Sequence, residues 1–256
     1  MAFFETYFDN GKLQYSSDFR AYSLIKSGQI YNSDFAVFYG DSGQQKLAMA
    51  VVGYPTGKWT TYKNPILFIR PPRGYLGVIT YMTEHYHIRN TTGLDSFSLF
   101  KWFNLNYSGS IQYYLFAQAK KAGSNYGLQI FDGNGTATNN LMLDSTWGLL
   151  SITNAITLPA YTPAVDQNGY YVNNFTLGTQ QAICLPRPRT GHITTQSANH
   201  KLHEGIWVDS SGKLGVGYVP IDSSDSGAGA LYREANNTEG SILICETAHL
   251  PSNYSI

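Results

Sequence analysis

Residues 66–81 read Ile-Leu-Phe-Ile-Arg-Pro-Pro-Arg-Gly-Tyr-Leu-Gly-Val-Ile-Thr-Tyr, and this segment indicates the class of fold. Two short runs rich in branched and aromatic residues, 66–69 and 76–81, flank the sequence Arg-Pro-Pro-Arg-Gly. Apolar runs of about four to eight residues between Pro and Gly are typical of β-strands. Because proline lacks a backbone N–H, the segment between the two runs cannot lie in the middle of a sheet.

Similar short runs follow one another along the whole chain. Turn-forming pairs such as Asn168-Gly169 and Ser211-Gly212 separate several of them. No long segment shows the 3.6-residue period of an amphipathic helix. We therefore expect an all-β protein built from antiparallel sheets. The further predicted strands are residues 35–39, 47–52, 111–116, 129–131, 148–156, 181–185, 214–219 and 241–246.

An internal repeat divides the chain into two parts. The segment 68–73 matches 184–189 without a gap, and Gly77 to Thr80 matches Gly191 to Thr194. Further matches in the same order join 8–11 to 131–135, 115–119 to 244–248, and 124–126 to 252–254. This collinear set predicts a tandem duplication with a small polar linker at 121–125. We expect two tandem antiparallel β-sandwich domains, residues 1–121 and 126–256.

Composition and charge exclude several classes of function. The chain has 256 residues, of which 13% are charged and 14% aromatic, including 20 Tyr. Its 17 basic and 17 acidic residues give a net charge of zero, whereas nucleic-acid binders normally carry a basic excess. No apolar run is long enough for a membrane-spanning helix, and the first residues lack the pattern of a secretory signal. We expect neither nucleic-acid binding nor membrane insertion.

A resemblance to a known family comes from residues 126–135, Tyr-Gly-Leu-Gln-Ile-Phe-Asp-Gly-Asn-Gly, followed by Asp144-Ser145. This segment resembles the opening strand and hairpin of a family of small proteins of tailed bacteriophages, which are encoded among tail and tail-fibre genes. A degraded form of the same element occurs at 4–11 and 17–18. The resemblance implies a tail component of the virion, made in the host cytoplasm. The chain departs from the family in being doubled, and beyond this segment the likeness extends only to length and strand pattern.

The two cysteines do not suggest a disulfide or a metal site. Cys184 and Cys245 correspond to Phe68 and Phe116 of the other copy. A position that takes Phe in one copy and Cys in the other is apolar, and two Cys are too few for a four-ligand zinc site. We expect both to be buried free thiols.

No other motif indicates catalysis or a cofactor. The chain lacks a Gly-x-Ser-x-Gly elbow, a Walker loop and a Rossmann fingerprint in the required context. The clusters at 85–87 and 200–204 hold two His each, with Glu204 beside the second. Neither cluster has an evident third ligand with second-shell support, so we expect structural or surface histidines. We expect a protein that is not an enzyme and holds no cofactor and no metal.

Two sets of residues are candidates for contacts with partners. Arg70, Arg73, Arg187 and Arg189 alternate with prolines in the repeated segment. They are suited either to assembly contacts on a neighbouring subunit or to an ordinary surface edge. If the protein is a tail-tip adhesin, the segments 81–93 and 161–175 are its candidate recognition loops, because Tyr covers apolar ring faces and also offers a hydroxyl. The alternative is that the same aromatic side chains pack between subunits. Their candidate residues are Tyr81, His85, Tyr86, His87, Tyr161, Tyr170 and Tyr171.

Three functions remain open at this point. The first is a structural tail protein in the tube, hub or fibre-attachment region, which binds other virion proteins and forms a homo-oligomer. The second is a receptor-binding or lectin-like adhesin at the tail tip, which binds a host surface glycan or protein. The third is a capsid decoration protein. We favour the first, which is what the resemblance implies and with which a neutral, Tyr-rich β protein without a cofactor motif is compatible.

Overall fold

The computed structural model describes most of the chain as β-strands. The described residues are 5–7, 13–16, 21–39, 47–55, 63–83, 96–102, 106–118, 127–131, 141–160, 169–186, 188–194, 199–224, 233–235 and 239–256. Within these ranges the only helical element is the 3-10 turn η1 (Asn32–Asp34). The predicted all-β, antiparallel class is confirmed.

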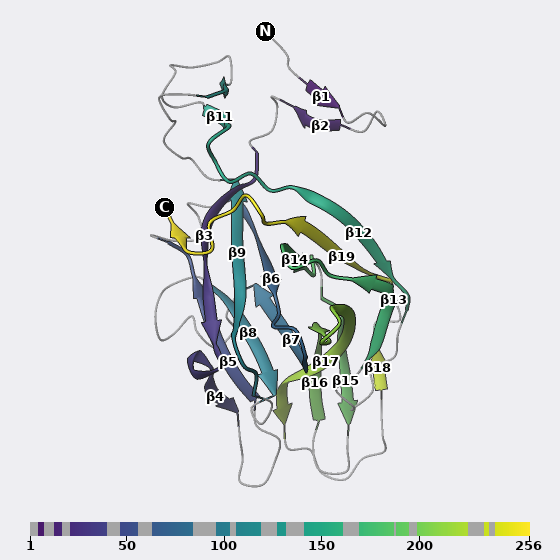
Figure 1. The fold of residues 1–256 in the computed structure, drawn as a ribbon. Coiled ribbons are helices and arrows are strands. Elements are labelled where there is room, and N and C mark those ends of the chain that lie inside the picture. The colour runs from purple at the N-terminus through teal and green to yellow at the C-terminus, as the bar shows by residue number, and fades with distance from the viewer. Residues whose placement is uncertain are drawn as a thin grey trace.

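Seven strands form the first sheet, in the order β12-β19-β14-β6-β9-β3-β20 (Figure 1). All of its neighbouring strands are antiparallel. The bounds are β3 (Ser23–Tyr31), β6 (Lys63–Arg70), β9 (Ser110–Gln118), β12 (Ile152–Leu158), β14 (Gln181–Cys184), β19 (Gly240–Glu246) and β20 (Tyr254–Ser255).

The second sheet follows the order β13-β17-β16-β7-β8-β5-β4, with β15 paired to both β16 and β18 beside this path. These pairs are antiparallel as well. The bounds are β4 (Ala36–Tyr39), β5 (Leu47–Gly53), β7 (Tyr75–Thr83), β8 (Ser96–Trp102), β13 (Tyr170–Thr176), β15 (Thr190–Thr194), β16 (Asn199–Val208), β17 (Lys213–Ser224) and β18 (Arg233–Ala235).

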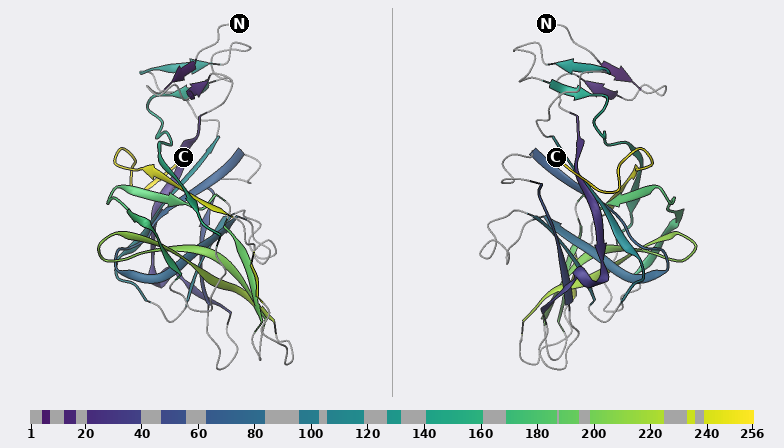
Figure 2. Two further views of the ribbon diagram at one scale, coloured as in Figure 1. Left: turned by 90° about the vertical axis from the view of Figure 1, so that its right-hand side faces the viewer. Right: turned by 60° about the vertical axis from the view of Figure 1, so that its left-hand side comes forward.

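Two small hairpins complete the described strands. β1 (Glu5–Tyr7) pairs with β2 (Leu13–Ser16), and β10 (Gln129–Phe131) pairs with β11 (Leu141–Asp144). They come from the opening segments of the two sequence repeats. Both hairpins lie together at one end of the molecule, beyond the two large sheets (Figure 2).

The two halves of the chain contribute strands in matching order. In the first sheet β3-β9-β6 of the first half corresponds to β12-β19-β14 of the second. In the second sheet β5-β8-β7 corresponds to β13-β17-β16. The duplication itself remains a prediction from the sequence, but each half has the same pairing scheme.

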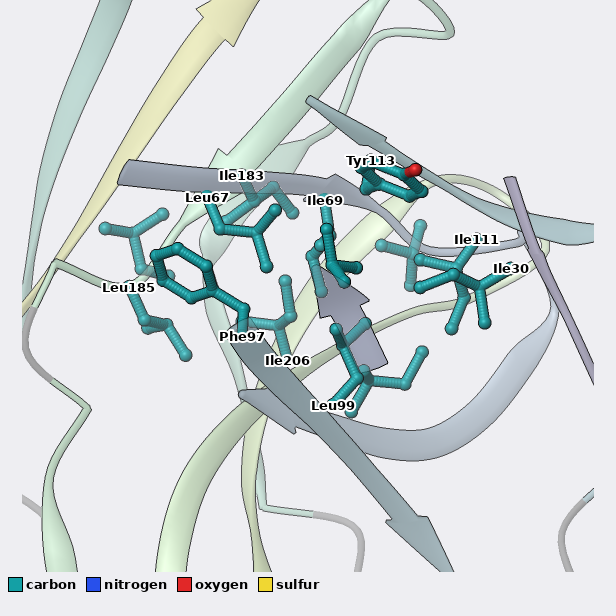
Figure 3. Close-up of a cluster of buried hydrophobic side chains, with 14 of the residues drawn as sticks. Ile30, Leu67, Ile69, Phe97, Leu99, Ile111, Tyr113, Ile183, Leu185 and Ile206 are labelled. Atoms are coloured by element: carbon teal, nitrogen blue, oxygen red, sulfur yellow. The ribbon is translucent and has the colours of Figure 1, made fainter. Parts of the chain in front are cut away.

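The halves 1–121 and 126–256 join edge to edge, and they do not form two separate sandwiches with a core each. Ile183 of β14 pairs with Ile69 of β6 in the first sheet, and Ile206 of β16 pairs with Ile79 of β7 in the second. One cluster of buried residues therefore contains side chains of both halves (Figure 3). The boundary predicted near residue 121 divides the strand sets, whereas the sheets and the main core continue across it.

Alternation along the strands explains how this core forms. Ile111, Tyr113 and Leu115 of β9 belong to the cluster between the sheets, whereas Tyr114 and Phe116 belong to a second cluster. Successive side chains of a strand point to opposite faces, so β9 is covered on both sides. A strand buried on both faces reads as a nearly continuous apolar run, which is what the sequence of β9 shows.

The second cluster holds both cysteines. Phe68 and Phe116 are in edge contact, with ring centroids 5.7 Å apart, and Cys184 and Cys245 belong to the same buried cluster. Both cysteines are free and buried, which confirms the prediction. Burial raises the pKa of the Cys245 thiol to about 12. The thiol therefore stays protonated at neutral pH.

The last ten residues, 247–256, form a segment that we call the C-terminal strap. Its first residues contact the second half, to which it belongs, whereas residues 251–256 lie on strands of the first half. Ser27 of β3 donates a hydrogen bond to the carbonyl oxygen of Pro251 (2.6 Å), and Gln112 of β9 donates one to Ser252 (2.7 Å). Tyr254 and Ser255 then pair with β3 as strand β20. The strap thus covers the outer edge of β3.

Candidate functional site

Arg70 and Arg73, predicted as assembly contacts, join the two halves within one chain. Arg70, at the end of β6, donates hydrogen bonds to the carbonyl oxygen of Thr179 (2.6 Å) and to Thr247 Oγ1 (3.4 Å). Arg73, in the exposed turn after β6, donates to the carbonyl oxygen of Leu177 (2.7 Å). Their described contacts are therefore intramolecular, and a contact with a neighbouring subunit remains a prediction for these residues.

Arg189 forms a buried ion pair with Glu204. The side chains are only 4% and 0% exposed, respectively. Both Nε (2.9 Å) and Nη2 of Arg189 bond Glu204 Oε1, and the backbone N–H of Arg189 donates to Oε2 (3.1 Å). Burial tends to lower the pKa of Arg189, but the hydrogen bonds and charge of Glu204 outweigh it and raise that pKa. Arg187, the fourth predicted arginine, lies outside the described residues.

The ion pair also ties the second half together. Arg189 Nη1 donates to the carbonyl oxygen of Pro159 (2.6 Å), just after β12, and Nη2 donates to the hydroxyl of Tyr170 (3.2 Å) in β13. Glu204 and the neighbouring His200 and His203 lie in the strand β16. Because adjacent strand residues face opposite ways, His203 and Glu204 cannot converge on one ion. The described residues contain no group of three or more potential metal ligands.

The predicted recognition residues are only partly within the described chain. His85, Tyr86, His87 and Tyr161 lie outside it, and Tyr81 lies in β7, paired with Leu99. Tyr170 and Tyr171 lie side by side in β13. The hydroxyl of Tyr170 bonds Arg189, so one predicted tyrosine meets one predicted arginine. Tyr171, in contrast, is 51% exposed and is a candidate for outside contacts.

Tyr171 belongs to an aromatic and charged patch on the second sheet. Its ring lies edge-on to that of Trp207, with centroids 4.8 Å apart, and Lys213 Nζ lies 5.8 Å from its centroid. Tyr171 and Trp207 both pair with Gly215, whose missing side chain leaves room for the Trp207 ring. The Tyr171 hydroxyl donates to Asp209 Oδ2 (3.3 Å).

The electrostatics of this patch favour a fixed carboxylate. Hydrogen bonds from Ser211 and from the backbone N–H of Lys213 lower the pKa of Asp209. Partial desolvation, together with the charge of Asp209, raises the pKa of Tyr171. The buried Nε1 of Trp207 has no hydrogen-bond partner among the described residues. An exposed ring with a carboxylate and an ammonium group is suited to weak stacking and hydrogen bonding.

The segment that carries the family resemblance forms a compact hydrogen-bonded unit. Gln129 Nε2 donates to Asp144 Oδ2 (2.8 Å), and the N–H of Leu128 donates to Ser145 Oγ (3.0 Å). The N–H of Ser145 returns a bond to the carbonyl oxygen of Leu128 (2.9 Å). Gly127 has a positive φ of 95° and lies against the Ser145 side chain, so a larger residue does not fit there.

This unit holds an apolar side chain in solvent. Leu128 is 60% exposed, although it is bonded through its backbone N–H and carbonyl oxygen. Asp144 is fully buried and also accepts bonds from the N–H (2.8 Å) and hydroxyl (2.6 Å) of Thr146. The resemblance pointed to this segment, but Leu128 was not among the predicted site residues. Its signal in the sequence is an apolar residue directly after Gly127, between that turn and the strand.

Other functional candidates were also absent from the sequence reasoning. The partners of Tyr171 in the aromatic and charged patch are distant from it along the chain: Trp207, Asp209 and Lys213. They become its neighbours only through the pairing of β13, β17 and β16.

No helix among the described residues is long and apolar enough to span a membrane.

Comparisons of this chain with protein-family models, curated proteins and solved structures find no match in any of the three.

Proposed function

We propose that this protein is a structural component of the tail of a tailed bacteriophage, in the tube, hub or fibre-attachment region. It acts through contacts with other virion proteins and not through catalysis. The proposal rests first on the resemblance of residues 126–135 and Asp144-Ser145 to small phage tail proteins. It remains a proposal about role and location, since a fold alone does not define a function.

The observation that supports it best is the hydrogen-bonded unit at Gly127 to Gln129 with Asp144 and Ser145. The residues of the resembling motif are the ones that bond one another. They hold Leu128 exposed next to the hairpin β10–β11, which lies at one end of the molecule (Figure 2). An apolar side chain fixed in solvent on a rigid support is typical of a protein contact.

The first experiment locates the protein in the particle. Antibodies raised against the purified protein are applied to intact particles of the phage that encodes it, and bound gold label is counted by electron microscopy. Label on the tail supports the proposal. Label on the head would instead identify a capsid decoration protein, and unlabelled particles that lack the protein by mass spectrometry would overturn both.

The second experiment tests Leu128. We expect Leu128→Asp to fold normally but to be lost from particles, because a charge at an apolar contact must be desolvated. Val51→Asp is the matched control, since Val51 is 47% exposed in β5 of the second sheet. Equal incorporation of both variants would remove Leu128 from the proposed contact.

A tail-tip adhesin is the second candidate, and the exposed Tyr171 beside Trp207 favours it. The variant Tyr171→Ala separates the two roles. An adhesin carrying it would still assemble into particles that adsorb poorly to host cells. A purely structural protein would give particles that adsorb normally.

A further inference from the structure

The strand β12 is an edge of the seven-stranded sheet. Among the described residues it pairs only with β19. Its residues are exposed from Ile152 to Ala155 and at Thr157, and only Leu158 is fully buried. An edge strand presents a row of backbone N–H and C=O groups that can pair with another strand.

The corresponding edge of the other half is covered. β3 occupies the same place in the order β3-β9-β6 that β12 occupies in β12-β19-β14. The C-terminal strap pairs Tyr254 and Ser255 with β3 on that edge. The described chain provides no such strand for β12, although the two edges are equivalent in the pairing scheme.

The sequence of β12 provides little protection against pairing. It reads Ile-Thr-Asn-Ala-Ile-Thr-Leu, and residues 145–160 contain no charged side chain. Native edge strands are commonly protected by Lys, by Pro or by a bulge. Here the register is irregular only between Ile152 and Asn154, and Pro159 follows the strand, so residues 154–158 remain regular.

The core is also incompletely covered at this edge. Ile156 packs against the main core but remains partly exposed, and Ile152 is 40% exposed. An added strand would cover these side chains while it satisfies the backbone of β12. Both contributions favour an extension of the sheet.

We propose that β12 pairs antiparallel with β12 of a second copy of this chain, about a two-fold axis near Ala155. A strand that pairs with itself in this way forms an isologous interface, and a neutral edge brings no like charges together. The same kind of junction already joins the halves of one chain, where β14 pairs antiparallel with β6. The dimer goes beyond the proposed function and does not depend on where in a virion the protein acts.

The test uses two oppositely charged double variants of the full chain. Ala155 and Thr157 are exposed and lie on the same face of β12, so substitution there leaves the core unchanged. The variants are Ala155→Lys with Thr157→Lys, and Ala155→Glu with Thr157→Glu. The neutral control is Ala155→Ser with Thr157→Ser. Circular dichroism and thermal unfolding verify that each variant folds.

Sedimentation velocity over a concentration series measures the dimer. We expect the wild-type chain and the Ser control to dimerise, and each charged variant to dimerise at least about tenfold more weakly, through like charges held opposite each other. An equimolar mixture of the Lys and Glu variants should recover the dimer. A wild-type chain that stays monomeric at all concentrations would overturn the proposal, and so would a dimer insensitive to both charged variants. A dimer lost only on deletion of residues 254–256 would indicate exchange of β20 and would also overturn it.

Discussion

Replacement of Arg189 by Met should destabilise the protein strongly, because the buried carboxyl group of Glu204 would lose its ion-pair partner. In the wild-type chain the carboxylate of Glu204 accepts two side-chain bonds and one backbone bond, all from Arg189. In the variant only the backbone N–H would remain, at 3.1 Å from Oε2. Removal of one partner of a buried ion pair costs about 3–5 kcal/mol. The carbonyl oxygen of Pro159 also loses its donor, so the expected loss lies at the upper end.

The reverse replacement and the double variant complete the test. Glu204→Gln should cost a similar amount, because it leaves the Arg189 guanidinium buried without a counter-charge. The double variant Arg189→Met with Glu204→Leu should be more stable than either single variant, since a buried pair replaced by apolar residues costs little. The coupling free energy between the two positions should therefore be large.

Urea unfolding at pH 7, followed by tryptophan fluorescence, measures these free energies. For a chain of this length about 2–4 °C in Tm corresponds to each kcal/mol, so the Met variant should melt roughly 6–20 °C lower. Arg73→Met is the control, since the exposed Arg73 donates a hydrogen bond to the carbonyl oxygen of Leu177 and has no carboxylate partner in the described chain. Losses below about 1 kcal/mol in both single variants, or losses that simply add, would refute the reasoning.

Four further predictions concern stability and reactivity. Burial raises the pKa of Tyr75 above its ordinary value, so the stability that the neutral side chain contributes is full below about pH 10 and is lost above it. The variant Tyr75→Phe should therefore flatten the fall of Tm between pH 9 and 11, and an unchanged slope would contradict this. Gly127→Ala should lower the stability of the β10–β11 hairpin by about 1–2 kcal/mol, which limited proteolysis would detect as faster cleavage. The control Gly53→Ala, where the added Cβ meets no neighbouring atom, should have no such effect. Arg70→Met should speed amide hydrogen exchange at 177–181 and in the C-terminal strap, because the bond to Thr179 is lost; unchanged exchange there would disprove the link between the halves. Cys245 should resist thiol reagents in the native protein and react fully in urea, and rapid native labelling would show that it is accessible.

The sequence predicted strands in which apolar residues follow closely on one another. The runs at 111–116 and 214–219 lie within β9 and β17, which are buried on both faces there, and the predicted run 129–131 coincides with the partly buried β10. Turn residues bound these strands. The long strands β3 and β16 were not predicted, because Lys26 and the cluster His200 to Glu204 interrupt their apolar pattern.

The charged side chains that interrupt the apolar pattern of β3 and β16 bind partners that are distant in the sequence. Lys26 donates to the carbonyl oxygen of Gly53 (2.8 Å), and Glu204 is neutralised by Arg189. A hydrophobicity pattern over neighbouring residues does not reveal such partners. The candidate patch could not be predicted for the same reason, since Tyr171 and Trp207 come into contact only across Gly215. The equal order of strands in the two halves was implied by the repeat, but their edge-to-edge union depends on pairs such as Ile69 with Ile183.

The C-terminal strap has a consequence for the order of events at the ribosome. Ser27 and Pro251 are bonded to each other across 224 positions of the chain. The outer edge of β3 is therefore translated well before the strand that covers it. The first half must therefore remain with that edge uncovered until the residues of the C-terminal strap have been synthesised. A chain that lacks the C-terminal strap would expose both edges of the seven-stranded sheet, β3 and β12, and would be more prone to aggregate.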